Sequence, residues 1–416
     1  MEIYRIISEM SKKAQAASRK MAQLATADKN RALAKIAELL QERKELIQAE
    51  NQKDLQNGRE KGLSGAMLDR LELTDPVIDS MIQGLNEVIA LPDPVGEISE
   101  LVKRPNGLQV GRMRVPLGVI GMIYESRPNA TVDAAALCLK TGNAVILRGG
   151  SEALNSNLAL AGVLTDALAL AGLPEGAVQV VPITEREAVT ALIQQQDIVD
   201  LIIPRGGEGL IRFVAENSRV PVLKHYKGVC HIFVDQAADL QKALSVIINS
   251  KSRPGVCNAL EGLLIHQQIA EKFIPEMAQK LIESGIELFG CEKCAAIEPK
   301  ISRTDELWGT EFLDMKLCVK VVDDYEQARQ YIDQYGSRHT EVIITEDYSL
   351  AHKFIQEIDA SAVMVNASTR FNDGGQLGLG AEIGISTTKL HAYGPMGLKE
   401  LTTRKFVVYG QGQVRE

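Results

Sequence analysis

The chain has 416 residues, too many for one ordinary hydrophobic core, so its length predicts two or three domains. It carries 46 basic and 54 acidic residues, a net charge of −8 at pH 7, and no block of like charge resembles a nucleic-acid footprint. No apolar run approaches the about 18 residues of a membrane span, and the N-terminus mixes charged with apolar residues, unlike a secretion signal. We therefore expect a soluble, cytoplasmic protein with no nucleic-acid or membrane partner.

The N-terminal third of the chain is mainly helical by its apolar spacing. Residues 1–56 predict two long helices, the second opening near Thr26 and Asp28 as N-cap candidates. A third helix is expected around residues 76–91. The pattern then changes, and residues 97–118 predict a β-hairpin that turns at the Pro-Asn-Gly run ending at Gly107.

A last strand is expected over residues 401–409, at the far end of the chain. Neither this segment nor the hairpin at 97–118 has an obvious partner in its own domain. Edges of this kind pair across subunits. We therefore expect a homo-oligomer built through a small β element, with the number of subunits left open.

Residues 118–224 alternate apolar strands with helices, which predicts a parallel sheet covered on both faces, a Rossmann-like nucleotide-binding domain. The last strand of this series is expected at 221–224. The usual Gly-x-Gly-x-x-Gly fingerprint is missing. Two other turns place glycines and a cation at the carboxyl end of a strand, where phosphates and riboses bind: residues 142–152 and 203–209. Glycines used for turn geometry alone would look the same.

The second half, from His231 onward, is again α/β. Strands are expected at 232–234, 318–322, 341–345 and 362–366, with helices at 240–249, 269–284 and 348–358. Six cysteines are few for this length, so reduced thiols are expected. Cys291 and Cys294 have zinc or redox spacing, but no second ligand pair follows, so we favour two ordinary loop thiols and no metal site.

Cys257 is the candidate nucleophile. It lies between a Pro-Gly turn at Pro254 and a run that reads as a buried strand, so a ligand can reach the thiol while its backbone stays rigid. Lys251 and Arg253 are close in sequence and could favour the thiolate. A buried cysteine used as a small hydrophobe is the alternative, and the flanking cations and Asn258 favour chemistry.

The whole order of motifs resembles the aldehyde dehydrogenase superfamily, and within it the glutamate-5-semialdehyde dehydrogenases, also called γ-glutamyl phosphate reductases. The resemblance spans the full chain. It rests on five motifs: Tyr124-Glu-Ser-Arg-Pro-Asn129, Lys224-His-Tyr-Lys-Gly-Val-Cys-His231, Arg253-Pro-Gly-Val-Cys-Asn258, Val365-Asn-Ala-Ser-Thr-Arg-Phe371 and Gly380-Ala-Glu-Ile-Gly-Ile-Ser-Thr387.

The resemblance implies a reaction. L-Glutamyl 5-phosphate is reduced with NADPH to L-glutamate 5-semialdehyde and phosphate, the second step of proline biosynthesis from glutamate, through a thioester on Cys257. Asn129 and the backbone amide of Cys257 are the candidate oxyanion donors, although Asn129 is equally well read as a turn residue after Pro128. Glutamate 5-kinase, which supplies a labile substrate, is a candidate partner.

Further site residues follow from the same resemblance. For the cofactor, Arg148 corresponds to a lysine at the adenine ribose, Ser151 lies where a 2′-phosphate binds, and Glu311 corresponds to the glutamate at the nicotinamide ribose; a cation at 148 suits NADP or NADPH. A solvated loop carboxylate is the alternative for Glu311. The turn with Arg205, Gly206 and Gly207 completes the cofactor set.

The loop from Asn366 to Phe371 corresponds to the one that anchors the far end of the substrate. Its Ser368, Thr369 and Arg370 suit the α-carboxylate and α-ammonium of glutamate. The alternative is that Arg370 only pairs with Asp373 to shape the loop.

The segment from Lys224 to Gly228 stands where hydrolytic aldehyde dehydrogenases keep the glutamate that activates water. Lys224, His225 and Arg253 are candidates to hold phosphate, although Lys224 could equally snorkel at a strand end. The absent glutamate argues against the rival reading as a hydrolytic enzyme, and the retained Cys257 argues against an inactive relative of the fold.

The resemblance also divides the chain by function. Residues 1–96 and 119–228 form the NADPH-binding domain and residues 229–388 the catalytic domain. Residues 97–118 and 389–416 form the oligomerisation segments. The expected fold class is thus α/β and aldehyde dehydrogenase-like, with a Rossmann-like cofactor domain, an α/β catalytic domain and a small β oligomerisation element.

Overall fold

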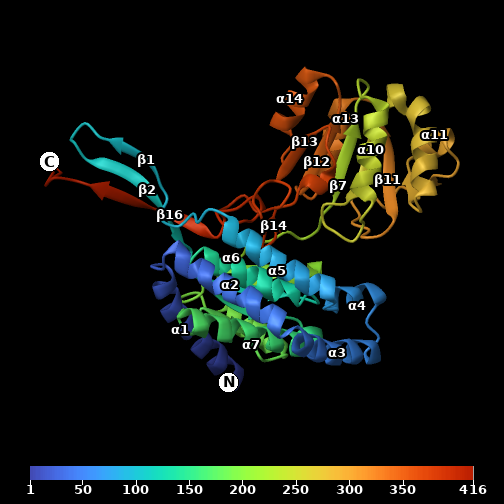
Figure 1. Ribbon diagram of the computed structural model, residues 1–416. Helices are drawn as coiled ribbons and strands as arrows, with labels where there is room; N and C mark the ends of the chain where they lie inside the picture. Colours follow the sequence, from blue (N-terminus) through green and yellow to red (C-terminus); the bar gives the residue numbers. More distant parts are fainter. Residues whose placement is uncertain (416) are drawn as a thin grey trace. The chain divides into compact units, whose positions relative to one another are not determined.

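A computed structural model of the chain describes residues 1–415 and divides into two compact units, each with its own parallel sheet (Figure 1). Unit 1 comprises residues 1–224, 378–384 and the C-terminal segment from Met396. Unit 2 comprises His225–Leu377 and Ile385–Pro395. The predicted α/β class is confirmed.

Unit 1 contains a four-stranded parallel sheet in the order β5-β4-β3-β6. Its central strands are buried at every residue because helices cover both faces. The strands are β3 (Val119–Tyr124), β4 (Ala144–Arg148), β5 (Val178–Val180) and β6 (Leu201–Arg205). The helices after the first strand of this sheet are α6 (Asn129–Lys140), η1 (Ser151–Ala153), α7 (Leu154–Ala171), α8 (Arg186–Ile193) and α9 (Glu208–Asn217).

The N-terminal helices differ in number from the prediction. The expected second helix is interrupted at Arg43, and a short fourth helix begins after Ser64, whose hydroxyl accepts the amide hydrogen of Met67. The helix expected near 76–91 is confirmed. The five helices are α1 (Glu2–Met21), α2 (Thr26–Glu42), α3 (Lys44–Glu60), α4 (Gly65–Leu71) and α5 (Asp75–Ala90).

The strand expected at 221–224 is wrong. This segment makes only one isolated bridge, between Val222 and Ile202, and leaves the sheet after it. Pro221 has no backbone N–H, so it can accept the amide hydrogen of Ile202 but cannot continue a ladder.

A separate three-stranded antiparallel sheet in unit 1 has the order β1-β2-β16. The hairpin of β1 (Ile98–Lys103) and β2 (Gln109–Pro116) turns at Gly107, whose φ of 89° favours glycine, as predicted. Strand β16 (Thr402–Tyr409) pairs with β2 along its whole length. The premise that these segments lack a partner in their own domain is therefore wrong: they pair with one another, and β1 and β16 remain as edges.

Unit 2 contains a seven-stranded parallel sheet in the order β10-β9-β11-β8-β7-β12-β13. Successive residues of β7 (Cys230–Val234) point to opposite sides: Ile232 and Val234 join one apolar cluster, and Phe233 joins another. The other strands are β8 (Leu260–His266), β9 (Glu287–Gly290), β10 (Ser302–Arg303), β11 (Lys316–Val322), β12 (Thr340–Ile344) and β13 (Ala362–Val365), with a small pair β14 (Ile385–Ser386) and β15 (Gly394–Pro395).

The long predicted helices of unit 2 are confirmed, and two further α-helices and four short strands (β9, β10, β14 and β15) were missed. Helix α13 fills the interval before β12, while β9, α12 and β10 fill the interval around Cys291. The helices are α10 (Leu240–Lys251), α11 (Gln267–Glu283), α12 (Glu292–Ile297), α13 (Tyr325–Tyr335), α14 (Tyr348–Glu357) and η2 (Thr369–Phe371).

Helix α7, with η1 before it, is long and apolar enough by composition to cross a membrane. It packs against α2, α3 and β5 within unit 1, and its Leu160, Val163 and Leu164 are buried. We therefore interpret it as a core helix and not as a membrane span.

Candidate active site

Cys257 lies in the loop between the end of α10 at Lys251 and the start of β8 at Leu260, at the amino edge of the unit 2 sheet. Its thiol is half-buried. The buried thiol of Cys230 donates to the Cys257 carbonyl at 3.2 Å. The Asn258 amide donates to the carbonyls of Arg370 and Asn372 at 3.3 and 3.1 Å. The nucleophile candidate thus has an accessible thiol on a backbone held from two sides.

Gly228 packs directly against this backbone. A Cβ atom at Gly228 would lie 2.0 Å from the Cys257 oxygen and 2.8 Å from its Cα, so only glycine allows this approach. The amide of Gly228 donates to Glu311 Oε1 at 2.8 Å. Lys227 Nζ donates to the carbonyl of Gly309 at 3.0 Å. The segment that lacks the hydrolytic glutamate therefore contacts the nucleophile and ties the Glu311 loop to it.

The flanking cations differ from the prediction. Lys251 is fully buried and forms an ion pair with Glu261, at 2.6 Å between Nζ and Oε2, so its charge is compensated by that carboxylate. Arg253 is exposed. The expectation that Lys251 supplies free positive charge to Cys257 is therefore wrong, because a buried carboxylate already takes that charge.

The loop that follows β13 lies beside the nucleophile loop, because the Asn258 side chain of the nucleophile loop donates to two backbone carbonyls of the β13 loop. Ser368 and Thr369 are buried, and Ser368 Oγ lies 3.0 Å from Ser250 Oγ. Arg370 Nη1 donates to Ser252 Oγ at 3.1 Å, on the same loop as Cys257. Asp373 instead accepts backbone amides of the residues after it. Of the three predicted substrate residues, Arg370 has the accessible polar group.

His225 is half-buried at the start of unit 2, where its ring lies edge-on to that of His339, 5.8 Å between centroids. Lys224 is the last residue of the first stretch of unit 1 and is also half-buried. The predicted phosphate set of Lys224, His225 and Arg253 is thus divided between the two units.

The carboxyl edge of the unit 1 sheet carries two of the predicted cofactor residues, Arg148 and Arg205. Arg148 ends β4 opposite Ile123, and Arg205 ends β6 opposite Tyr124, so the two arginines flank β3. Arg148 is buried, and its Nη2 donates to the Thr184 carbonyl at 2.8 Å while its Nε has no hydrogen-bond partner. Burial lowers the pKa of Arg148.

The glycines in the turn after β6 lie beside the side chain of Glu125. A Cβ atom at Gly206 would lie 2.3 Å from a carboxylate oxygen of Glu125. The Gly207 amide donates to that carboxylate at 2.8 Å. Both glycines are exposed and precede α9, so they form an open strand-to-helix turn at the same edge.

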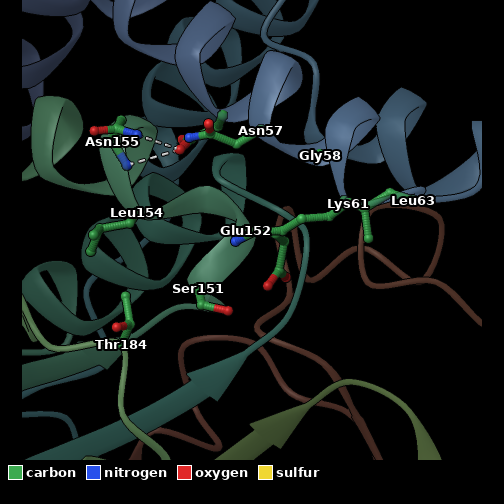
Figure 2. Close-up of a pocket in the computed structure, with 10 residues that line it drawn as sticks. Asn57, Gly58, Lys61, Leu63, Ser151, Glu152, Leu154, Asn155 and Thr184 are labelled. Carbon is green, nitrogen blue, oxygen red and sulfur yellow. Dashed lines mark hydrogen bonds between the residues drawn. The ribbon is translucent and has the colours of Figure 1, made fainter.

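Ser151 lines a cavity of about 380 Å³ in unit 1. Figure 2 shows the Lys61 side chain reaching from the turn between α3 and α4 toward Glu152 and Ser151. The Ser126 amide and hydroxyl both donate to Glu152 Oε1, at 2.6 and 2.8 Å. The sequence reasoning did not single out Lys61, because a lysine just after the end of a helix looks like any solvated cation.

Asn129 begins α6, just beyond the carboxyl end of β3. Its amide nitrogen lies 3.3 Å from Asp133 Oδ2 on the next turn of the helix. Burial raises the pKa of Asp133 to about 6. Asn129 belongs to unit 1 and Cys257 to unit 2, so its oxyanion role stays a prediction.

Among the remaining cysteines, Cys291 is the other half-buried thiol in the part of the chain that the structure describes. Cys291 Sγ and Cys294 Sγ lie 3.4 Å apart. The hydrogen bond from Cys294 lowers the pKa of Cys291 to about 5. This shift makes Cys291 a candidate for a second reactive thiol, and its interpretation as an ordinary loop thiol stays a prediction.

Comparisons with known proteins show which family has this sequence and architecture. The model of the aldehyde dehydrogenase family matches residues 5–287. The γ-glutamyl phosphate reductase of Desulfotalea psychrophila is 61% identical over 417 residues, covering 100% of both chains. That of Geotalea daltonii is 56% identical over 418 residues, again covering 100% of both.

Solved structures agree with the sequence comparison. The crystal structure of γ-glutamyl phosphate reductase from Thermotoga maritima has a TM-score of 0.97 and 49% identity, covering 99% of this chain and 100% of that one. An acetylating aldehyde dehydrogenase from Geobacillus thermoglucosidasius has a TM-score of 0.72 at 17% identity, covers 100% of this chain and 98% of that one, and shares the fold alone. The predicted resemblance is confirmed: this chain belongs to the aldehyde dehydrogenase family and is an oxidoreductase of that family.

Proposed function

We propose that the chain reduces L-glutamyl 5-phosphate to L-glutamate 5-semialdehyde, with release of phosphate, as the second step of proline biosynthesis from glutamate. The relatives that cover the whole chain are named for this activity. One observation carries the proposal: the backbone of Cys257, whose side chain is half-buried, packs against Gly228, in a segment with no carboxylate to activate water.

The chemistry assigned to the chain is covalent. The Cys257 thiolate attacks the acyl carbon, and the bond from that carbon to the phosphate oxygen breaks as the thioester forms. NADPH, when bound, supplies the hydride. The Cys257 sulfur then leaves as thiolate when the carbonyl of the aldehyde re-forms. The Cys257 amide and Asn129 are proposed to donate to the oxyanion of both steps.

The residues at the unit 1 edge fit a dinucleotide phosphate. Arg148 has a buried Nε without a partner and donates to the carbonyl of Thr184, and Thr184 lines the same cavity as Ser151 and Lys61. Cations and hydroxyl donors of this kind suit a 2′-phosphate, which distinguishes NADPH from NADH. Arg205, Gly206 and Gly207 line the same edge. In unit 2, Glu311 is proposed to hold the nicotinamide ribose.

The substrate is proposed to lie between Cys257 and Arg370, whose loops are tied together by Asn258. The Arg370 guanidinium would bind the α-carboxylate in place of its present contact with the Ser252 hydroxyl. Because Ser368 and Thr369 are buried, their proposed role is to position this loop rather than to contact the ligand. Lys224, His225 and Arg253 are the proposed cations for phosphate.

Residues 1–96 and 119–228 are proposed to serve NADPH binding, and residues 229–388 catalysis. The sheet of β1, β2 and β16 exposes Leu101, Val102 and Phe406 and keeps two open edges. We propose that it joins subunits of a cytoplasmic homo-oligomer. Glutamate 5-kinase, whose product is labile, is the proposed supplier of substrate.

The test is an assay of the purified protein with glutamate semialdehyde, NADP and phosphate. Formation of NADPH that depends on all three components is the expected result. Absence of NADPH formation, from a protein shown to be folded by circular dichroism, would contradict the proposal.

A further inference from the structure

The Lys251–Glu261 pair joins the two ends of the nucleophile loop. Lys251 is the last residue of α10, and Glu261 is the second residue of β8, so the pair closes the base of the loop that carries Cys257. The Nζ and Oε2 atoms lie 2.6 Å apart, and the two side chains are 0% and 1% exposed. Taking both charges of so buried an ion pair out of water costs free energy. The pair is therefore weak evidence that its role is to stabilise the fold.

The other oxygen of Glu261 reaches a different loop. Glu261 Oε1 accepts the amide hydrogen of Leu313 at 3.2 Å, and the backbone of Phe312 also hydrogen-bonds this carboxylate. Lys251 Nζ lies 5.9 Å from the centre of the Phe312 ring. Leu313 has a φ of 51°, a left-handed conformation that a leucine keeps only when its surroundings impose it.

The loop held in this way carries Glu311. On its other side the same loop is fixed by the Gly228 amide to Glu311 and by Lys227 to the Gly309 carbonyl. The Glu311 loop is therefore held on one side by Gly228, which packs against Cys257. On the other side it is held by Glu261 of the Lys251–Glu261 pair. Neither Lys251 nor Glu261 has an exposed group for a ligand to contact.

We propose that Lys251 and Glu261 are positioning residues that hold the Glu311 carboxylate in register with Cys257. The inference rests on the proposed function, in which Glu311 binds the nicotinamide ribose and Cys257 carries the acyl group. Loss of the Glu261 acceptor releases the backbone of residues 312 and 313. Cofactor binding weakens as a result, because Glu311 must then be ordered when the cofactor binds.

Two double variants separate this role from simple stability. Lys251→Met with Glu261→Gln leaves no unpaired buried charge and keeps an oxygen for the Leu313 amide. Lys251→Met with Glu261→Met also leaves no charge but removes that oxygen. The exposed pair of Lys242 and Glu346, at 2.9 Å, supplies the control, with both residues changed to Met.

Binding of NADPH is measured by its fluorescence, and unfolding by circular dichroism. The Met/Met variant should bind NADPH on the order of fivefold more weakly than the Met/Gln variant, the effect of one neutral hydrogen bond. The control pair should match the wild type. Equal NADPH dissociation constants for the Met/Met and Met/Gln variants would overturn the inference, whatever their melting temperatures.

Glu311→Gln separates failure of the inference from failure of the proposed function. If Glu311→Gln weakens NADPH binding and the Met/Met variant does not, only the positioning role is wrong. If Glu311→Gln has no effect, the cofactor role of Glu311 fails, and the inference fails with it.

Hydrogen exchange on the wild-type chain gives a test that depends on no variant. The amide of Leu313 should exchange slowly in the free protein, because a buried carboxylate accepts it. Exchange at the rate of an unstructured loop would contradict the anchoring.

Discussion

Gly228→Ala should impair catalysis through a single methyl group. The new Cβ would lie 2.0 Å from the Cys257 oxygen, whereas ordinary contacts begin at 3.4 Å, so one of the two backbones must move by more than 1 Å. Neither atom belongs to a flexible side chain that could turn away. A displacement of about 1 Å in a catalytic site costs on the order of 100-fold in rate.

The assay for this variant is kcat with glutamate semialdehyde, NADP and phosphate. Gly162→Ala is the matched control, because Gly162 lies inside α7 and an added Cβ meets nothing within 4 Å. That change should leave kcat unaltered and stabilise the fold by roughly 0.5–1 kcal/mol, the helix preference of alanine over glycine. A Gly228→Ala enzyme with wild-type kcat would refute the argument that this glycine sets the position of Cys257.

Four further outcomes follow from the site. Cys257→Ala should remove turnover by several orders of magnitude while NADPH fluorescence still reports binding, and retained turnover would end the thioester mechanism. Iodoacetamide at pH 6 should label Cys291, because its pKa, lowered to about 5, leaves it as thiolate above that pH; peptide mass spectrometry with Cys291→Ser as control reports this, and an unlabelled Cys291 would contradict its reactivity. Arg370→Ala should raise the KM for glutamate semialdehyde on the order of 10-fold or more, the loss of a charged hydrogen bond, and an unchanged KM would show that Arg370 only shapes its loop. Lys61→Ala should raise the KM for NADPH and not that for NADH, and equal effects on both cofactors would remove Lys61 from the 2′-phosphate site.

The elements with strong periodic signals could be predicted from the sequence. The strands of the unit 1 sheet and the helices α10, α11 and α14 agree with their apolar spacing. Short elements such as β9 and α12 were missed because a few residues give no period to count. Pro221 was read as part of a strand because its apolar neighbours outweighed its missing amide hydrogen.

The features of the candidate site also fall into those that the sequence could predict and those that it could not. The Cys257 loop could be singled out because it combines turn residues with a reactive side chain in one short stretch, whereas the loop with Arg370 was predicted from the resemblance to the aldehyde dehydrogenase superfamily. The burial of Lys251 against Glu261 could not be found, since it depends on β8 returning beside the end of α10. The approach of Gly228 to Cys257 joins residues far apart in sequence, so a lone glycine gave no signal of it.

The fate of the Cys257 acyl group tests the central claim most directly. The enzyme, glutamate semialdehyde and NADP are mixed with and without phosphate, and NADPH and the products are measured. The absence of a water-activating carboxylate at Lys224–Gly228 predicts NADPH formation that requires phosphate and yields the acyl phosphate. Steady NADPH formation without phosphate, with free glutamate as product, would contradict both the acyl-phosphate reaction and the role given to this segment.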